Sequence, residues 1–248
     1  MPVACGEIRH YRTWFRPEGD LCAFRVVYRE TDLAVLAERD LSLEVLQLVQ
    51  EIRAPLEEYL KEHPEFLSSL KPLPEDPGAP EIVKRMLAAG RAVGVGPMAA
   101  VAGAIAEAVG RRLLAEGLTR KVVVENGGDI FLALGRAATV ALYAGDSPLS
   151  GKVGLRIAPD FQPCGVCTSS GKIGHSLSLG QAEAVTVIAP EAALADAAAT
   201  ALGNLAKGKK SLRRILSAAR DLPGLLGVVC ILGKDLGAVG PAVELVPL

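Results

Sequence analysis

One stretch, residues 184–204, most constrains the fold because it contains a complete transition from strand to helix. Its first six residues alternate in the manner of a strand, and the rest is rich in alanine, the strongest helix former. Pro190 and Glu191 suit a first helical turn, and Gly203 with Asn204 provides a C-terminal stop. We therefore expect a strand that leads directly into a helix.

This helix carries one acid among its alanines. Asp196 and Thr200 are four residues apart, so their Cβ atoms should lie about 5–6 Å from each other on one face. Carboxylate and hydroxyl oxygens suit a hard cation, and Mg²⁺ usually needs only one or two protein carboxylates together with substrate phosphates. An Asp on a solvated helix face is the competing interpretation, so these residues alone leave metal binding open.

Composition excludes several classes of function. Half of the 248 residues are hydrophobic, which is enough for a sizeable core, and 27 basic against 28 acidic residues give no bulk charge for nucleic acid or an anionic membrane. No apolar run reaches the roughly 18–20 residues of a membrane span, and the start lacks the apolar segment of an export signal. Five scattered cysteines fit a reducing compartment. We therefore expect a cytoplasmic protein with no nucleic-acid and no membrane partner.

The N-terminal third predicts a hairpin followed by a long helix. Residues 6–15 and 21–30 alternate as strands, a third strand is expected near residues 31–37, and residues 42–62 have helical periodicity. Pro55 should kink or divide that helix. Five prolines make residues 63–80 a loop, which could bound an N-terminal subdomain, residues 1–80, within a single domain of residues 1–248. Further helices are expected at residues 81–92, 97–117 and 210–221, and further strands at 121–125, 130–134, 139–144, 152–158, 225–232 and 243–246.

Two polar segments are candidates for ligand binding. Asn-Gly-Gly-Asp at residues 126–129 interrupts strand character, which indicates a hairpin turn or bulge, or a backbone surface that a flat ligand can contact. Thr-Ser-Ser-Gly at residues 168–171 predicts a turn rich in hydroxyls and amides, with Lys172 and His175 close by. Such groups suit phosphate oxygens, although a serine-rich surface turn is nearly as good an interpretation.

The segment before this second turn fits three other site types poorly. A P-loop is excluded because five residues, not four, separate Gly165 and Gly171, and Ile173 stands where a hydroxyl should bind Mg²⁺. Cys164 and Cys167 have redox spacing, but no helical pattern follows them, and no second pair completes a zinc site. We interpret both cysteines as packing residues.

Three stretches together, in their order and spacing, resemble the ApbE-like superfamily of FAD:protein FMN transferases. They are VGPMAAVAGAIAEAVGRRLLAEGLTRKVVVENGGDIFLALG, CTSSGKIGHSLSLG and AVTVIAPEAALADAAATALGN, all within residues 93–204. The family pattern is a glycine-rich entry to a helix, Asn-x-Gly-Gly-Asp after a strand, Thr-Ser-Gly followed by His, and Ala-Asp-Ala-x-x-Thr. The chain most resembles a shorter, non-lipoprotein branch of that superfamily. The implied fold is α+β, ApbE-like (T-fold-like), with a largely antiparallel sheet and packed helices.

The resemblance also implies roles for individual residues. Mg²⁺ would be bound by Asp196, Thr200 and a backbone carbonyl near Val101. The flavin nucleotide would be bound by two sets of residues, which are Asn126, Gly127, Gly128 and Asp129, and Thr168, Ser169, Ser170 and Gly171. Lys172 would stabilise phosphate oxyanions, with His175 as the catalytic base. The chain departs from the family at Ala102, where the family has Lys before a Gly, and after His175, where an Asp-Pro-x-Thr-Gly motif is absent.

Three functions follow as hypotheses, and the third is a purely structural role in a complex. The first is a Mg²⁺-dependent enzyme that binds FAD, breaks its pyrophosphate and delivers FMN to a hydroxyl of an acceptor protein, which is phosphoryl transfer. The second is a non-catalytic flavin or nucleotide binding module of the same fold. The expected partners are a flavin nucleotide, an acceptor protein if FMN is transferred, and a second copy of the chain if it forms a homodimer.

Overall fold

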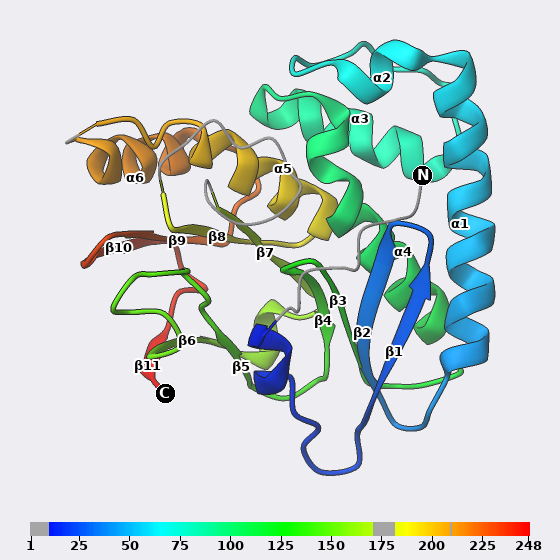
Figure 1. Cartoon of the computed structure of the whole chain (residues 1–248), viewed down its shortest axis with the longest axis horizontal. Helices are drawn as coiled ribbons and strands as arrows, with labels where there is room; N and C mark the ends of the chain where they lie inside the picture. The colour runs from blue at the N-terminus through cyan, green and yellow to red at the C-terminus, as the bar shows by residue number, and fades with distance from the viewer. Residues whose placement is uncertain (1–9, 171–181, 209) are drawn as a thin grey trace.

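Three layers make up the protein in a computed structural model, which describes residues 10–170, 182–208 and 210–248. Helices cover one face of a large sheet, and a small sheet lies against the other face (Figure 1). The large sheet has eight strands in the order β1-β2-β3-β4-β7-β8-β9-β10, and every neighbouring pair is antiparallel. The expected α+β class with a largely antiparallel sheet is confirmed.

The strands of the large sheet are β1 (Cys22–Tyr28), β2 (Thr31–Ala37), β3 (Val122–Asn126), β4 (Asp129–Ala133), β7 (Cys164–Ser169), β8 (Ala184–Ala189), β9 (Gly227–Leu232) and β10 (Asp235–Val239). The small sheet, in the order β11-β6-β5, contains β5 (Ala138–Ala141), β6 (Val153–Ile157) and β11 (Leu245–Pro247). β1 and β2 belong to the same sheet as the later strands, since β2 pairs with β3. The subdomain boundary within residues 63–80 stays a prediction.

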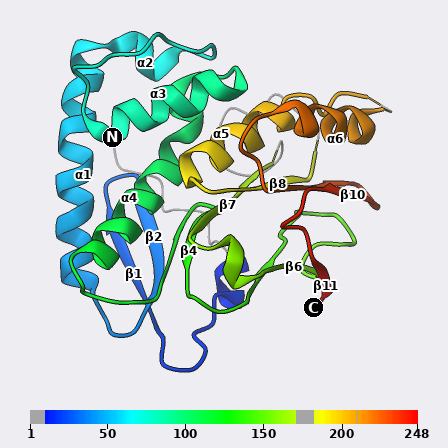
Figure 2. The same ribbon diagram turned by 180° about the vertical axis from the view of Figure 1, so that it is seen from behind.

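Each helix that touches the large sheet covers particular strands, as the view from behind also shows (Figure 2). Helix α1 (Ser42–Glu62) packs on β1, α4 (Val101–Ala115) on β3 and β4, α5 (Ala192–Gly203) on β7 and β8, and α6 (Ser211–Asp221) on β9 and β10. Helix α3 (Glu81–Val93) packs on α5 and on the 3-10 helix η2 (Pro97–Ala100). The remaining short helices are α2 (Pro64–Ser68), η1 (His10–Trp14) and η3 (Pro159–Phe161).

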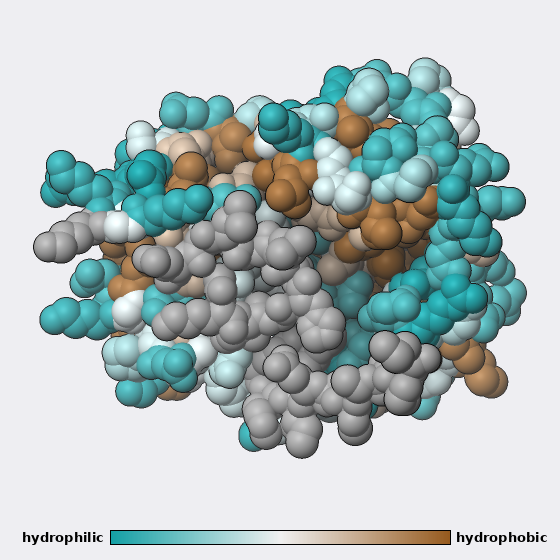
Figure 3. All heavy atoms as spheres, turned by 45° about the horizontal axis from the view of Figure 1, so that its top comes forward, coloured by the Kyte–Doolittle hydropathy of each residue, from teal (hydrophilic) through white to brown (hydrophobic). Residues whose placement is uncertain are grey.

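Two hydrophobic cores follow from the alternation of side chains along the strands. In β3, Val122 and Val124 belong to the core beneath the helices, whereas Val123 belongs to the core beneath the small sheet. The central strands are therefore buried on both faces, which explains their continuous apolar sequence. On the helical side, apolar surface is interleaved with hydrophilic side chains (Figure 3).

No single helix of the described residues is long and apolar enough to cross a membrane. One pair, Glu81–Val93 with Pro97–Ala115, meets the length and composition criteria together, but it is bent by 105°.

Several sequence-based expectations for the first third are wrong. Residues 10–14 form η1 instead of a strand, and the first hairpin is β1–β2, with its turn at Arg29 and Glu30. Pro55 does not divide α1, because the buried residues Ile52 and Leu56 on either side of it hold the helix against the core, and a kink at Pro55 stays a prediction. Pro64, expected in a loop, is the first residue of α2, where proline costs no hydrogen bond. Strand β10 was not predicted.

Candidate functional site

The glycine turn (residues 126–129) joins β3 to β4 as a two-residue hairpin. Asn126 and Asp129 are paired across it, and Gly127 and Gly128 have φ values of +71° and +102°. Positive φ at both central positions is typical of the hairpin turns that match strand twist, and glycine adopts it without strain. Of the alternatives that the sequence leaves open, the hairpin turn is therefore the local structure.

A partly buried group of ion pairs supports this turn from the side of the small sheet. Glu125 accepts the Gly128 N–H through Oε1 (2.8 Å) and the Arg12 Nε–H through Oε2 (2.7 Å). Arg12, in η1, also donates to Asp32 Oδ1 (2.7 Å) and to the Asp32 carbonyl (2.6 Å). Burial by itself lowers the pKa of Arg12, but Glu125 and Asp32 outweigh it and raise that pKa above its ordinary value. Sequence reasoning missed Arg12 because no local pattern links it to a residue 113 positions away.

On the helical side of the sheet, Asp129 lies opposite Cys167 in β7. Its carboxylate accepts the Thr168 N–H and contacts the Cys167 thiol. The residue is 7% exposed, and its Oδ1 has no hydrogen-bond partner among the described residues. Burial, and then the charges of Asp196 and Glu125, raise the pKa of Asp129 well above its usual range.

Thr168 and Ser169 belong to strand β7 and not to a turn, so the expected turn at residues 168–171 is wrong for its first half. Both pair with β8, Thr168 opposite Thr186 and Ser169 opposite Val185, and these ladder bonds decide their conformation. The Thr168 hydroxyl shares a hydrogen bond of 2.9 Å with that of Thr186. Ser170 follows the strand, and Gly171, Lys172 and His175 lie outside the described residues.

Helices α4 and α5 cap each other at their N-termini. Asp196, in α5, accepts the Gly103 N–H (2.9 Å) and the Ala102 N–H, which are first-turn donors of α4 without a partner inside that helix. Glu107, in α4, accepts the Ala192 N–H (2.6 Å) at the start of α5. Burial raises the pKa of Asp196 to about 7, and the two amides oppose this shift. Asp196 therefore has a structural role besides any role toward a ligand.

Close contact between these two helices depends on Gly103. A Cβ atom at this position would lie 2.3 Å from the Ala192 carbonyl oxygen and 2.9 Å from Asp196 Cβ. No residue other than glycine fits there without moving a helix. The sequence left open whether the small residues of this helix serve packing or a ligand, and at Gly103 they serve packing.

The glycine turn is tied to the same helix ends. Asn126 Nδ2 donates to the Ala102 carbonyl (3.1 Å), so the turn, the start of α4 at Val101 and the Asp196 carboxylate meet at one place. Thr200 is buried one turn further along α5 than Asp196. Within residues 10–170, 182–208 and 210–248, no group of three or more His, Cys, Asp or Glu could hold a metal ion. A cation here would need hydroxyl, carbonyl and substrate oxygens as well.

The two cysteines of β7 point to opposite faces of the sheet. Cys164 lies in the core beneath the small sheet, and Cys167 in the core beneath the helices. Both are free thiols. Burial raises the pKa of Cys164 to about 12, and burial, followed by the charges of Asp129 and Asp196, raises that of Cys167 well above its usual range. Protonated, buried thiols are poor nucleophiles, which agrees with packing residues.

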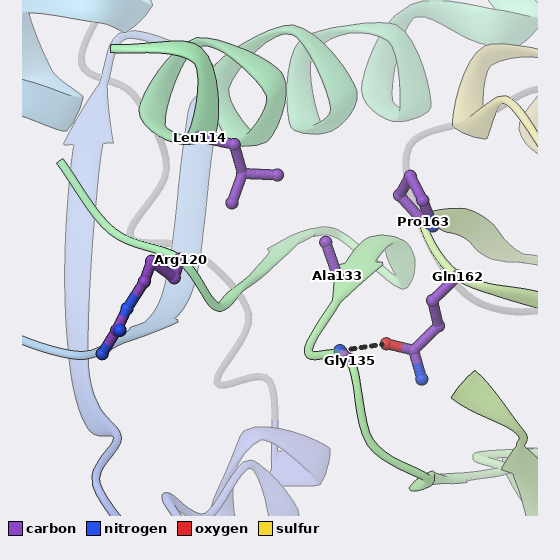
Figure 4. Close-up of a pocket in the computed structure, with 6 residues that line it drawn as sticks. All are labelled: Leu114, Arg120, Ala133, Gly135, Gln162 and Pro163. Atoms are coloured by element: carbon purple, nitrogen blue, oxygen red, sulfur yellow. Dashed lines mark hydrogen bonds between the residues drawn. The ribbon is translucent and has the colours of Figure 1, made fainter. Parts of the chain in front are cut away.

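A separate hollow of about 180 Å³ lies at the other end of β4, away from Asp129. Its lining residues are Leu114, Arg120, Ala133, Gly135, Gln162 and Pro163 (Figure 4). Gln162 Oε1 accepts the Gly135 N–H (3.2 Å), and Arg120 forms an ion pair with Glu38 (3.0 Å). The polar groups that line the hollow therefore make contacts within the protein. None of the expected site residues that the structure describes lines this hollow.

Comparison with known proteins identifies the family. A family model described as AbpE bacteria matches residues 12–226. A UPF0280 protein of Methanopyrus kandleri is 42% identical over 233 residues, which cover 91% of this chain and 93% of that protein. A UPF0280 protein of Methanococcus aeolicus is 42% identical over 198 residues, covering 78% of this chain and 79% of that protein.

Among solved structures, the apbe protein of Thermotoga maritima matches with a TM-score of 0.55 at 12% identity, over 88% of this chain and 96% of that chain. At this identity the likeness concerns the fold, and it agrees with the α+β architecture described above. The match of the family model over most of the chain is the stronger finding. The chain therefore belongs to the family described as AbpE bacteria, as a short ApbE-like member.

Proposed function

We propose that this protein binds a flavin nucleotide, FAD or a close relative, together with Mg²⁺, and that it breaks the FAD pyrophosphate to transfer FMN to a protein hydroxyl. The observation that carries the proposal is the convergence of the glycine turn, the N-terminus of α4 and Asp196 at one place. These are the segments whose motifs resemble those of the FMN transferases. Membership of the AbpE bacteria family supports it further.

The charges of the site suit a divalent cation. Asp129 and Asp196 face the same region, both have raised pKa values, and Asp129 Oδ1 is buried without a described partner. Negative charge that is crowded and poorly solvated in this way is stabilised by a cation with a preference for oxygen ligands. Asp196, Thr200 and the carbonyl of Val101 would hold Mg²⁺. Bound there, the metal would neutralise charge on the phosphates during phosphoryl transfer.

The protein's own residues would bind and orient the nucleotide. The glycine turn offers backbone free of side chains, and Asn126 is held in one orientation by the Ala102 carbonyl. In the transfer, an acceptor hydroxyl would attack the phosphorus of the FMN half, the P–O bond to AMP would break, and His175 would take the hydroxyl proton. Lys172 would stabilise the phosphate oxygens. We propose that this takes place in the cytoplasm.

One departure of this sequence from the family pattern favours a second candidate function, a flavin-binding module that has no catalytic activity. Ala102 stands where the family pattern has Lys, and its carbonyl is already used by Asn126. A site without that cation would keep the turn and the metal ligands but stabilise the transition state less well.

Incubation of the pure protein with FAD and Mg²⁺, followed by chromatography for AMP, separates these functions. Release of AMP that EDTA abolishes supports the enzyme. Binding of FAD without AMP supports the module. Absence of FAD binding with and without Mg²⁺ contradicts both.

A further inference from the structure

Two buried polar atoms of the described residues lack a hydrogen-bond partner, and both lie beside the candidate site. They are Asp129 Oδ1 and Ser169 Oγ, in residues that are 7% and 9% exposed. Buried polar groups are satisfied in the great majority of cases, because an unmet group costs about 1–3 kcal/mol or more if charged. Two such atoms close together therefore indicate a ligand that supplies their missing interactions.

Both atoms lie on the helical face of the large sheet. Phe131 of β4 and Cys167 of β7 belong to the core beneath the helices, and Asp129 and Ser169 are two positions from them on the same strands. Asp129 is opposite Cys167, so Ser169 is its diagonal neighbour across the strand pair. The two side chains thus share one face at one end of these strands.

Asp196 lies in α5, which packs on this face of the sheet. The Cys167 thiol contacts the Ala192 carbonyl (3.4 Å) in the first turn of α5, and Asp196 follows one turn later on the same side of that helix. Burial, and then the charge of Asp196, raise the pKa of Asp129, as expected for two carboxylates that face one region. Arg12, which neutralises Glu125, lies on the opposite face of the sheet and donates its Nε–H to Glu125 Oε2.

The chemistry of these groups selects the ligand class. The other carboxylate interactions of Asp129 are with the Thr168 N–H and the Cys167 thiol, neither of which carries positive charge. An anion would be repelled by two carboxylates, and an apolar group would leave them unsatisfied. A hard divalent cation, or a water bound to one, satisfies carboxylate and hydroxyl oxygens together.

We propose that Asp129 supplies a second carboxylate to the divalent-cation site, beside Asp196, and that the Ser169 hydroxyl completes this side of the site. The inference rests on the proposed function and adds two residues that the metal set Asp196, Thr200 and Val101 does not contain. Asp129 thereby belongs to the metal site, and the glycine turn that positions it couples the nucleotide to the metal.

The test uses Mg²⁺ alone, without flavin, on the metal-free full chain. Calorimetric titration and thermal melts compare the parent with Asp129→Asn, Asp196→Asn, Ser169→Ala and the control Asp160→Asn, an exposed acid in η3. Asp129→Asn should bind Mg²⁺ at least about tenfold more weakly. Even mutation of residues that only hydrogen-bond to metal ligands lowers metal affinity by about 10–100-fold. Without metal it should melt at or above the parent, because the substitution removes charge repulsion. Asp160→Asn should match the parent in both.

Undiminished Mg²⁺ affinity in folded Asp129→Asn overturns the inference. If that variant does not fold, Asp129→Ser takes its place, with the same expected loss. Loss of Mg²⁺ binding in Asp196→Asn but not in the Asp129 variant contradicts this inference alone. Failure of the parent to bind Mg²⁺ also overturns it, and FAD titration of the same sample then decides the proposed function separately.

Discussion

Reciprocal capping of α4 and α5 makes Glu107 a sharp test of how the site is held together. Its side chain is 1% exposed, and Oε2 accepts the Ala192 N–H (2.6 Å) while Oε1 accepts the Arg111 Nε–H (2.6 Å). Glu107→Gln keeps the shape of the side chain and removes its charge. The variant should therefore weaken the start of α5, the helix that carries Asp196, without opening a cavity.

The magnitude follows from these contacts. Hydrogen bonds to a charged group contribute about 1.5–3 kcal/mol, and a negative charge at a helix N-terminus contributes about 0.3–1 kcal/mol, up to about 2 when partly buried. Glutamine can still accept one N–H, so we expect a loss of about 2–3 kcal/mol in the free energy of unfolding. For a chain of this size, each kcal/mol shifts Tm by about 2–4 °C, so the melting temperature should fall by about 4–12 °C.

Thermal melts and urea unfolding measure this loss, and Glu81→Gln is the matched control. Glu81 also pairs with an arginine on the helical surface, Arg85 (3.0 Å), but its side chain is 72% exposed. Exposed pairs contribute about 0–1 kcal/mol, so the control should melt close to the parent. A Glu107→Gln protein that melts within about 2 °C of the parent would refute the capping argument.

Three other predictions concern the site. Arg12→Lys should lower the free energy of unfolding, measured in urea, by about 2–3 kcal/mol, because one ammonium group cannot bind Glu125 and Asp32 as the planar guanidinium does. A loss below about 0.5 kcal/mol would contradict the stabilising role of these ion pairs. Gly128→Val should lower the free energy of unfolding by about 1–3 kcal/mol, since φ at this position is +102°. It should also weaken FAD binding more than tenfold, measured by fluorescence at a temperature where the variant is folded. Normal FAD binding by the folded variant would show that the turn has only a structural role. Burial raises the pKa of Asp196 to about 7, so the metal-free parent should lose stability relative to Asp196→Asn as pH rises from about 4 to 7. Thermal melts of both proteins across this range measure the difference. Equal changes of melting temperature with pH in the two proteins would contradict the raised pKa.

Local patterns predicted the elements that depend on local chemistry. The stretch 184–204 forms β8 and α5 as expected, because alternating β-branched residues and a run of alanines each favour one conformation. The glycine turn follows from two adjacent glycines between strands. These two segments contain six of the residues proposed for the site, which explains why part of it could be identified from the sequence.

Non-local contacts decided what the sequence could not show. Arg12 is held in η1 by Glu125, far along the chain, so the alternating pattern around it did not produce a strand. Thr168 and Ser169 look like turn residues, but the ladders with β4 and β8 place β7 in the middle of the sheet. The exchange of caps between Asp196 and Glu107 depends on the approach of two helices at Gly103, which no single segment contains.

Titration of FAD into the protein in the presence of Mg²⁺ and again in EDTA tests the central claim most directly. Quenching or enhancement of flavin fluorescence gives the affinity, and Asp196→Asn is titrated beside the parent. We predict saturable binding that weakens at least about tenfold in EDTA, and a variant whose affinity is low and unaffected by Mg²⁺. Equal FAD affinity for parent and variant, with and without Mg²⁺, would contradict a metal-dependent flavin site at the junction of α4, α5 and the glycine turn.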